Sequence, residues 1–131
     1  MGVDENVAAV RDFVERAWNG GEEAVFCEHL APDFGGPGGR ERFKATVLGF
    51  RAAFADFELE VHDMFGAGEK VVTRFVMRGT HAGEFMGIAA TGRPVSIDGI
   101  AIDVMRDGVR VEGWAEIDRL GLLRQLGAAD G

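Results

Sequence analysis

Two β-strands joined by a tight turn are predicted by residues 95–117, which read VSIDGIAIDVMRDGVRVEGWAEI. Valine and isoleucine dominate both halves of this stretch, as is typical of strands. Asp107-Gly108 between them favours a two-residue hairpin, because such turns need positive φ angles that Asp and Gly tolerate. With that turn, Arg106 faces Val109, and Asp103 faces Glu112. The C-terminal part of the chain therefore predicts an antiparallel sheet.

The segments before this hairpin add two strands and a closing element. Apolar and polar residues alternate over 57–62 and again over 71–80, with a turn at 66–69 between them. Residues 83–93 contain three glycines without a clear period, which indicates a loop. The leucines at 120–126 predict a short closing helix or turn.

Three helices are predicted ahead of the strands, at about 4–17, 22–30 and 40–55. In the first, Asp4 is expected to be the cap, and the apolar stripe follows helical spacing. Helices first and a sheet afterwards indicate the α+β class. We expect one domain over 1–131, in which a strongly curved antiparallel sheet and three helices enclose an apolar pocket.

Composition narrows the functional classes. The chain has 131 residues, 47% of them apolar, and a net charge of -8, which argues against nucleic acid and anionic membranes as partners. Without a bilayer-length apolar run or a signal peptide, a cytoplasmic location is expected. The single Cys excludes an internal disulfide, and the three scattered His predict no metal site. Because Tyr is absent, no mechanism can use a phenol side chain.

Short segments spread over nearly the whole chain carry a family resemblance. They include residues 30–34 (LAPDF), 78–85 (RGTHAGEF), 91–95 (TGRPV), 112–114 (EGW) and 121–127 (GLLRQLG). In this order and spacing they resemble the SnoaL-like polyketide cyclases of the NTF2-like superfamily. The resemblance implies an NTF2-like cone around an apolar pocket.

The resemblance also implies an activity. Well-known members close a ring of an aromatic polyketide ester by intramolecular aldol condensation, without a cofactor or metal. A hydrophobic, polyketide-like small molecule would be the substrate. The alternatives are a SnoaL-like hydroxylase, another pocket enzyme of this fold, or a non-catalytic small-molecule-binding protein. This chain departs from the family at Gly113, where a His is common, and in the loop after Phe34, which lacks another His.

Three residues are candidates for catalysis. The family's general acid/base, an Asp near the end of the last strand, corresponds to Asp118; a helix cap is the alternative role of that residue. Asp98 could supply a second carboxyl group, but alternation puts it on the opposite face, so a β-bulge would be needed. His81 could stabilise an enolate as neutral imidazole, or hold backbone groups in its loop.

Six further residues are candidates for the pocket wall: Trp18, Phe85, Met86, Asp103, Trp114 and Glu116. Each has an ordinary alternative, either core packing for the apolar ones or a solvated sheet face for the acidic ones. The outer face of the sheet, which includes Trp114, is also expected to pair with a second copy in an isologous homodimer.

Overall fold

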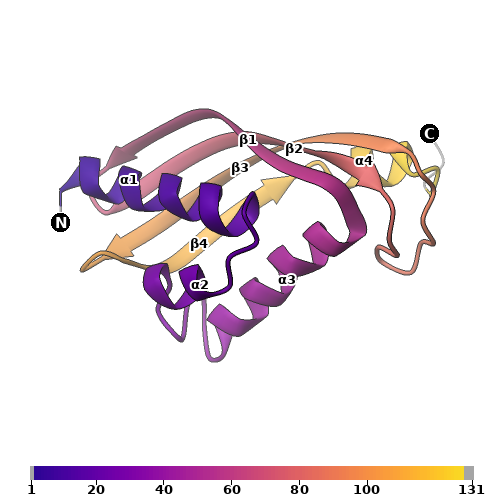
Figure 1. Ribbon diagram of the computed structural model, residues 1–131. Helices are drawn as coiled ribbons and strands as arrows, with labels where there is room; N and C mark the ends of the chain where they lie inside the picture. Colours follow the sequence, from indigo (N-terminus) through magenta and orange to yellow (C-terminus); the bar gives the residue numbers. More distant parts are fainter. Residues whose placement is uncertain (1, 129–131) are drawn as a thin grey trace.

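The first three helices of the chain lie on the concave side of one curved sheet, and the last helix lies apart from them at one end of the sheet (Figure 1). In this computed structural model, which describes residues 2–128, the chain begins with α1 (Val3–Phe13), which continues as the π-helical turn η1 (Val14–Trp18). Two more helices follow, α2 (Ala24–His29) and α3 (Gly39–Ala53). No helix in residues 2–128 combines the length and apolar character that crossing a membrane requires.

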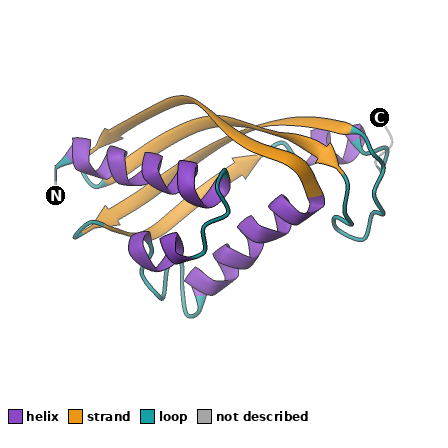
Figure 2. Cartoon of the chain, viewed as in Figure 1, coloured by secondary structure: helices purple, strands orange, loops and turns teal. Residues whose placement is uncertain are grey.

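Four antiparallel strands form the sheet in chain order (Figure 2). They are β1 (Phe54–Ala67), β2 (Lys70–His81), β3 (Pro94–Arg106) and β4 (Val109–Ile117). A short helix, α4 (Arg119–Gln125), follows them. The predicted α+β class and the order of helices and strands are confirmed.

The first helix differs from the prediction at its start. Gly2 occupies the N-cap position, no side chain caps the helix, and Asp4 lies in the first turn. The predicted cap at Asp4 is therefore wrong, although a carboxylate in the first turn still suits the positive end of the helix. At the other end, Asn19 exchanges two hydrogen bonds with the backbone of Leu59, of 3.0 and 2.7 Å. These bonds fasten the end of η1 to β1.

The hairpin turn forms where the sequence predicts it. Asp107 and Gly108 have φ angles of 51° and 82°, as a two-residue turn with the right-handed strand twist requires. Arg106 pairs with Val109 across the turn, which confirms the predicted register at this point.

A β-bulge then changes the register of the hairpin. Met105 pairs with Arg110, but Asp103 pairs with Gly113, so β4 contains one extra residue between these two pairs. The prediction that Asp103 faces Glu112 is wrong, because the simple register does not allow for the extra residue in β4. Strict alternation would put positions 110 and 113 on opposite faces of β4. The bulge lets both face the helices.

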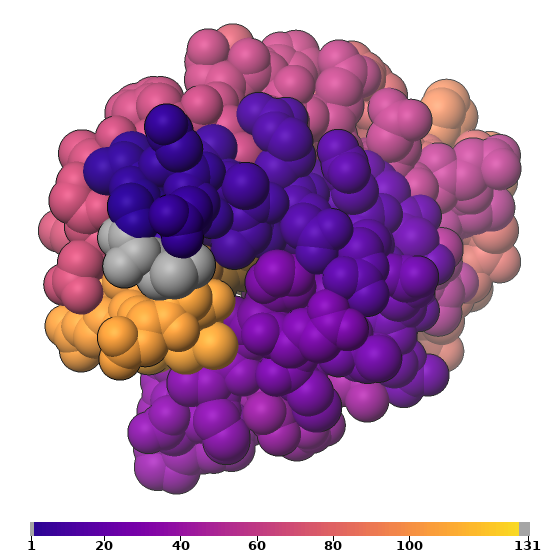
Figure 3. Space-filling model, turned by 60° about the vertical axis from the view of Figure 1, so that its left-hand side comes forward, coloured from indigo at the N-terminus to yellow at the C-terminus, as the bar shows by residue number. Residues whose placement is uncertain are grey.

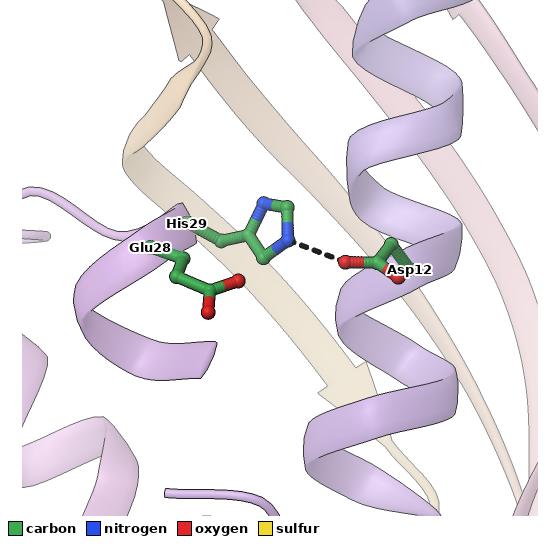
Figure 4. A group of neighbouring side chains, drawn as sticks. All are labelled: Asp12, Glu28 and His29. Atoms are coloured by element: carbon green, nitrogen blue, oxygen red, sulfur yellow. Dashed lines mark hydrogen bonds and ion pairs between the residues drawn. The ribbon is translucent and has the colours of Figure 1, made fainter. Parts of the chain in front are cut away.

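A cluster of charged side chains joins α2 to α1 (Figure 4). His29 Nε2 lies 2.7 Å from Asp12 Oδ2, and Arg16 Nη1 donates to that same oxygen at 3.0 Å. Arg16 Nη1 also donates to Glu28 Oε2 at 2.8 Å. The hydrogen bonds from His29 and then Arg16 hold the pKa of Asp12 below its ordinary value of 3.8.

This cluster should contribute to the acid sensitivity of the fold. Because the pKa of Asp12 is lowered in the folded chain, its carboxylate stabilises the fold above about pH 4, and the contribution disappears as pH falls below that. We expect Asp12→Asn to lower the free energy of unfolding at pH 7, with a smaller difference from wild type at pH 3. Urea unfolding at both pH values measures this. Asp33→Asn, at an exposed position, is the control, and an Asp12→Asn deficit that stays constant with pH would contradict the prediction.

Candidate active site

A cavity of about 250 Å³ lies between the helices and the inner face of the sheet. Figure 3 shows the end of the molecule where α1 (indigo) and the β3–β4 hairpin (orange) come together beside α2 (purple). The wall is mostly apolar and draws on α1, η1, α3 and all four strands. Its residues are Val10, Phe13, Val14, Trp18, Phe34, Phe43, Leu59, Thr73, Phe75, Ala101, Asp103, Arg110, Gly113, Trp114 and Ala115.

Aromatic rings form the helical side of this wall. Trp18 stacks on Phe57 with ring centroids 5.8 Å apart and meets Phe43 edge-on at 6.0 Å. Phe43 in turn stacks on Phe13 at 5.9 Å. Trp18, predicted to line the pocket, does so because η1 is held against β1. Such rigid apolar walls suit a flat hydrophobic ligand.

Two ionisable side chains belong to the cavity wall, as far as residues 2–128 show. Asp103 is 6% exposed and Arg110 is 5% exposed, and Arg110 Nε lies 3.4 Å from Asp103 Oδ1. The guanidinium carbon of Arg110 is 4.5 Å above the ring centre of Phe13, a cation–π contact. The buried hydroxyl of Thr73 is the third polar group of the wall. The cavity is therefore apolar apart from Thr73 and one small polar region, the Asp103–Arg110 pair.

Burial raises the pKa of the Asp103 carboxyl group, and the nearby Arg110 charge opposes that increase without cancelling it. A carboxyl group whose pKa moves towards neutral pH is suited both to accept and to return a proton. The structure thus combines a buried carboxyl group of raised pKa with a ligand-sized apolar space.

Gly113 makes room for this carboxyl group. A Cβ atom at position 113 would lie 2.7 Å from Asp103 Oδ1 and 3.2 Å from Cζ of Phe34. Since Asp103 and Gly113 pair directly across the sheet, their inner sides share one space. The sequence departs from the family pattern at Gly113, and the Asp103 carboxyl group occupies the space that a side chain at position 113 would need.

Asp118 and Asp98 lie near each other through their backbones, but neither lines the cavity. Asp118 Oδ1 accepts a hydrogen bond of 2.8 Å from the N–H of Gly121 and caps α4, and its side chain is exposed. Asp118 N–H donates to the carbonyl of Asp98 at 3.0 Å. The Asp98 side chain is exposed on the outer face, and Gly99 rather than Asp98 pairs with Ile117. The bulge in β4 shifts the pairing by one residue and so places Asp118 beside Asp98, but outside the cavity.

His81 is fully buried at the end of β2. Its Nδ1 accepts a 3.2 Å hydrogen bond from the N–H of Thr91 and lies 3.0 Å from the Thr91 hydroxyl. The imidazole also packs against Phe54, with ring centroids 5.6 Å apart. These contacts close the loop between β2 and β3, and His81 is not part of the cavity wall.

The remaining predicted pocket residues divide between the cavity and other surroundings. Trp114 borders the cavity, but it pairs with the exposed Ile102 on the outer face of the sheet, and 53% of it is exposed. Phe85 packs on Phe54 and Phe50 in a separate part of the core, with centroids 5.1 and 5.3 Å away. Met86 and Glu116 are exposed. Of the nine predicted site residues, the cavity brings together Trp18, Asp103 and Trp114.

Sequence reasoning missed Arg110 and Thr73. Both occur in alternating strand segments, where a polar residue normally faces solvent, and neither carries a motif. Arg110 faces the helices from its position opposite Met105, and the bulge, for which the sequence contains no clear signal, puts Gly113 instead of Glu112 opposite Asp103.

One group of side chains outside the cavity has ligand atoms close enough for a metal. The ligand atoms of Asp12, Glu28 and His29 lie within 4.8 Å of one another (Figure 4). The Arg16 guanidinium already forms ion pairs with both carboxylates of this group. The arrangement is that of an ion-pair cluster joining two helices.

Gly113→Ala should disturb the polar region of the cavity. The added methyl group must displace the Asp103 carboxyl group or the Phe34 ring, and such overpacking costs about 1–3 kcal/mol. Denaturant unfolding measures that loss. Gly49→Ala is the matched control, because a Cβ atom at this helical position meets nothing within 4 Å and should leave stability unchanged or raised by up to about 1 kcal/mol. Equal stability of the Gly113→Ala and wild-type proteins would contradict the close approach.

Comparisons with known proteins agree with this architecture. The chain is 31% identical to aklanonic acid methyl ester cyclase AcmA of Streptomyces galilaeus, over 95% of this chain and 92% of that protein. The structure of TsrD from Streptomyces laurentii superimposes with a TM-score of 0.89 at 28% identity, covering 98% of this chain and 99% of TsrD. Wild-type IdmH from Streptomyces antibioticus gives 0.80 at 32% identity, covering 93% and 98%. Residues 8–126 match the sequence profile of one family. The chain belongs to the SnoaL-like polyketide cyclases.

Proposed function

We propose that this protein closes a ring of a polyketide-like substrate by intramolecular aldol condensation, and that Asp103 is its general acid/base. One observation carries the choice of residue: Asp103 is the carboxyl group of the apolar cavity, and burial raises its pKa. Membership of the SnoaL-like polyketide cyclases supports the class of reaction.

The reaction needs one group that removes a proton from the carbon next to a carbonyl and later protonates the new alkoxide. A single carboxyl group can do both, as long as its pKa lies close enough to the working pH. Burial shifts the pKa of Asp103 upwards, in the direction that this role requires.

The size of the cavity supports a substrate that reacts at one end. An apolar protein cavity of about 150 Å³ holds a benzene molecule. The present cavity, of about 250 Å³, has room for the ring-forming part of a larger carbonyl-rich molecule. The substrate of the relative AcmA, aklanonic acid methyl ester, is the natural first compound to assay.

Two isosteric substitutions separate the competing acid/base candidates. We expect Asp103→Asn to lower kcat by about 10²- to 10⁴-fold, the usual contribution of general acid/base catalysis. Asp118→Asn should retain activity, because Asn is as good a helix cap as Asp and the carboxyl group lies outside the cavity wall. Turnover of aklanonic acid methyl ester, followed by product chromatography, measures both variants.

The reverse result would assign the role to Asp118, as the sequence-based prediction does. A loss in Asp118→Asn with full activity in Asp103→Asn would exclude Asp103 as the acid/base. Thermal unfolding of both variants shows whether either loss reflects folding instead of chemistry.

We also propose that the outer face of the sheet pairs with a second copy of the chain. Phe65, Val72, Ile102 and Trp114 are paired in one row across all four strands. Phe65 and Trp114 are more than half exposed, and Ile102 is 38% exposed. A continuous apolar row of this kind is unusual on a monomer and suits an isologous dimer.

Charged substitutions in this row should separate the proposed dimer. We expect Phe65→Glu and Ile102→Glu to give monomers in sedimentation analysis, because each places a carboxylate in the contact. Leu120→Glu, at a half-exposed position on α4 outside the row, should remain dimeric. Identical sedimentation of all three variants and the wild type would exclude this face as the contact.

A further inference from the structure

Arg110 is a buried cation whose Nε–H lacks a hydrogen-bond partner among the described residues. Its guanidinium lies against the Phe13 ring. The ion pair with Asp103 spans 3.4 Å without hydrogen-bond alignment. The Thr73 hydroxyl in the same cavity also lacks a partner. Buried polar groups are normally satisfied, so these atoms suggest that a ligand completes them.

The charge balance of the cavity indicates what kind of ligand this is. Arg110 remains a cation at all ordinary pH values. When Asp103 takes up a proton, Arg110 loses the carboxylate that balances its charge, and an uncompensated buried charge is costly. An anion that forms on the substrate in the same step would restore the balance.

We propose that Arg110 is the oxyanion-binding residue of the cavity, and that the site accordingly selects carbonyl compounds that ionise to enolates, such as 1,3-dicarbonyls and acidic phenols. This inference rests on the proposed function and names the substrate class of that same site. A guanidinium N–H of Arg110 donates to the anionic oxygen.

The electron movements are balanced without any further reactant. The substrate C–H bond breaks, its proton goes to Asp103, its electron pair forms the C=C bond, and the carbonyl π pair moves to the oxygen facing Arg110. The enolate carbon then forms the new C–C bond with a second carbonyl carbon, whose oxygen takes the proton back from Asp103. Arg110 faces a negative charge before and after the first transfer, which favours the transition state between them.

A chromogenic phenol tests this binding without any turnover. The ionised form of 4-nitrophenol absorbs visible light, so titration at a pH where the free probe is partly ionised reports which form binds. We expect wild-type protein to increase the ionised fraction. Arg110→Met should weaken binding of the phenolate about ten- to a hundred-fold, the size of a charge-assisted hydrogen bond. Arg110→Lys should retain part of the preference because it keeps the positive charge.

Two controls keep the result interpretable. The methyl ether 4-nitroanisole, which has nearly the same shape but cannot ionise, should bind equally to wild type and Arg110→Met. If Arg110→Met fails to fold because Asp103 is left unpaired, Asp103→Asn and the double variant Asp103→Asn/Arg110→Met give the same comparison with a neutral partner. Asp103→Asn alone should bind phenolate more tightly than wild type, since it removes a competing negative charge.

The two proposals can fail separately. Equal phenolate affinity with and without Arg110, or no increase in the ionised fraction on wild-type protein, would overturn the oxyanion role. That result would leave the role of Asp103 to the turnover assay. Full turnover in Asp103→Asn, together with phenolate binding that depends on Arg110, would instead overturn the acid/base assignment alone.

Discussion

A single extra residue in β4 determines which groups share the cavity. The bulge between Arg110 and Gly113 lets two positions three residues apart face the helices, although strand alternation would separate them. Gly113 thereby lies opposite Asp103 in place of Glu112, and its missing side chain leaves the carboxyl group its space beside Arg110. The polar region of the cavity depends on this local irregularity.

The rest of the fold provides the low-dielectric surroundings that give this pair its chemical character. The sheet is covered on one side by α1, η1 and α3, and their aromatic side chains form much of the cavity wall. Away from water, a carboxyl group is harder to ionise and a guanidinium attracts anions more strongly than at the surface. The same two residues on the outer face of the sheet would form an ordinary surface ion pair of small energetic value.

Other charged groups of the chain illustrate that contrast. Arg74 and Asp63 pair on the exposed face of β2 and β1, and each is more than half exposed. Asp118 is likewise exposed, and its carboxylate caps the N-terminus of α4. These groups stabilise local structure, whereas Asp103 and Arg110 face an interior space large enough for a ligand. Burial, more than residue type, distinguishes the candidate site from the remaining charges of this acidic chain.

Much of the architecture follows from local sequence patterns, because helix periods, strand alternation and turns depend on residues that are close together in the sequence. The helical and strand periods, the Asp107-Gly108 turn and the family segments correctly indicate three helices, four antiparallel strands and an apolar pocket. Local patterns also suggest the cap at Asp118, the alternative that the sequence left open. They misplace the start of the first helix, because backbone geometry there leaves Gly2 at the cap position.

The sequence by itself determined the fold class, the family and Asp103 as one of several acidic candidates. Only the tertiary structure decided which carboxyl groups stay outside the cavity, since a one-residue shift in the pairing of β4 puts Gly113 instead of Glu112 opposite Asp103. It also revealed Arg110, whose contact with Asp103 and Phe13 joins a strand to a helix almost a hundred residues earlier in the chain. Such contacts arise from packing between elements, and no spacing within one element encodes them.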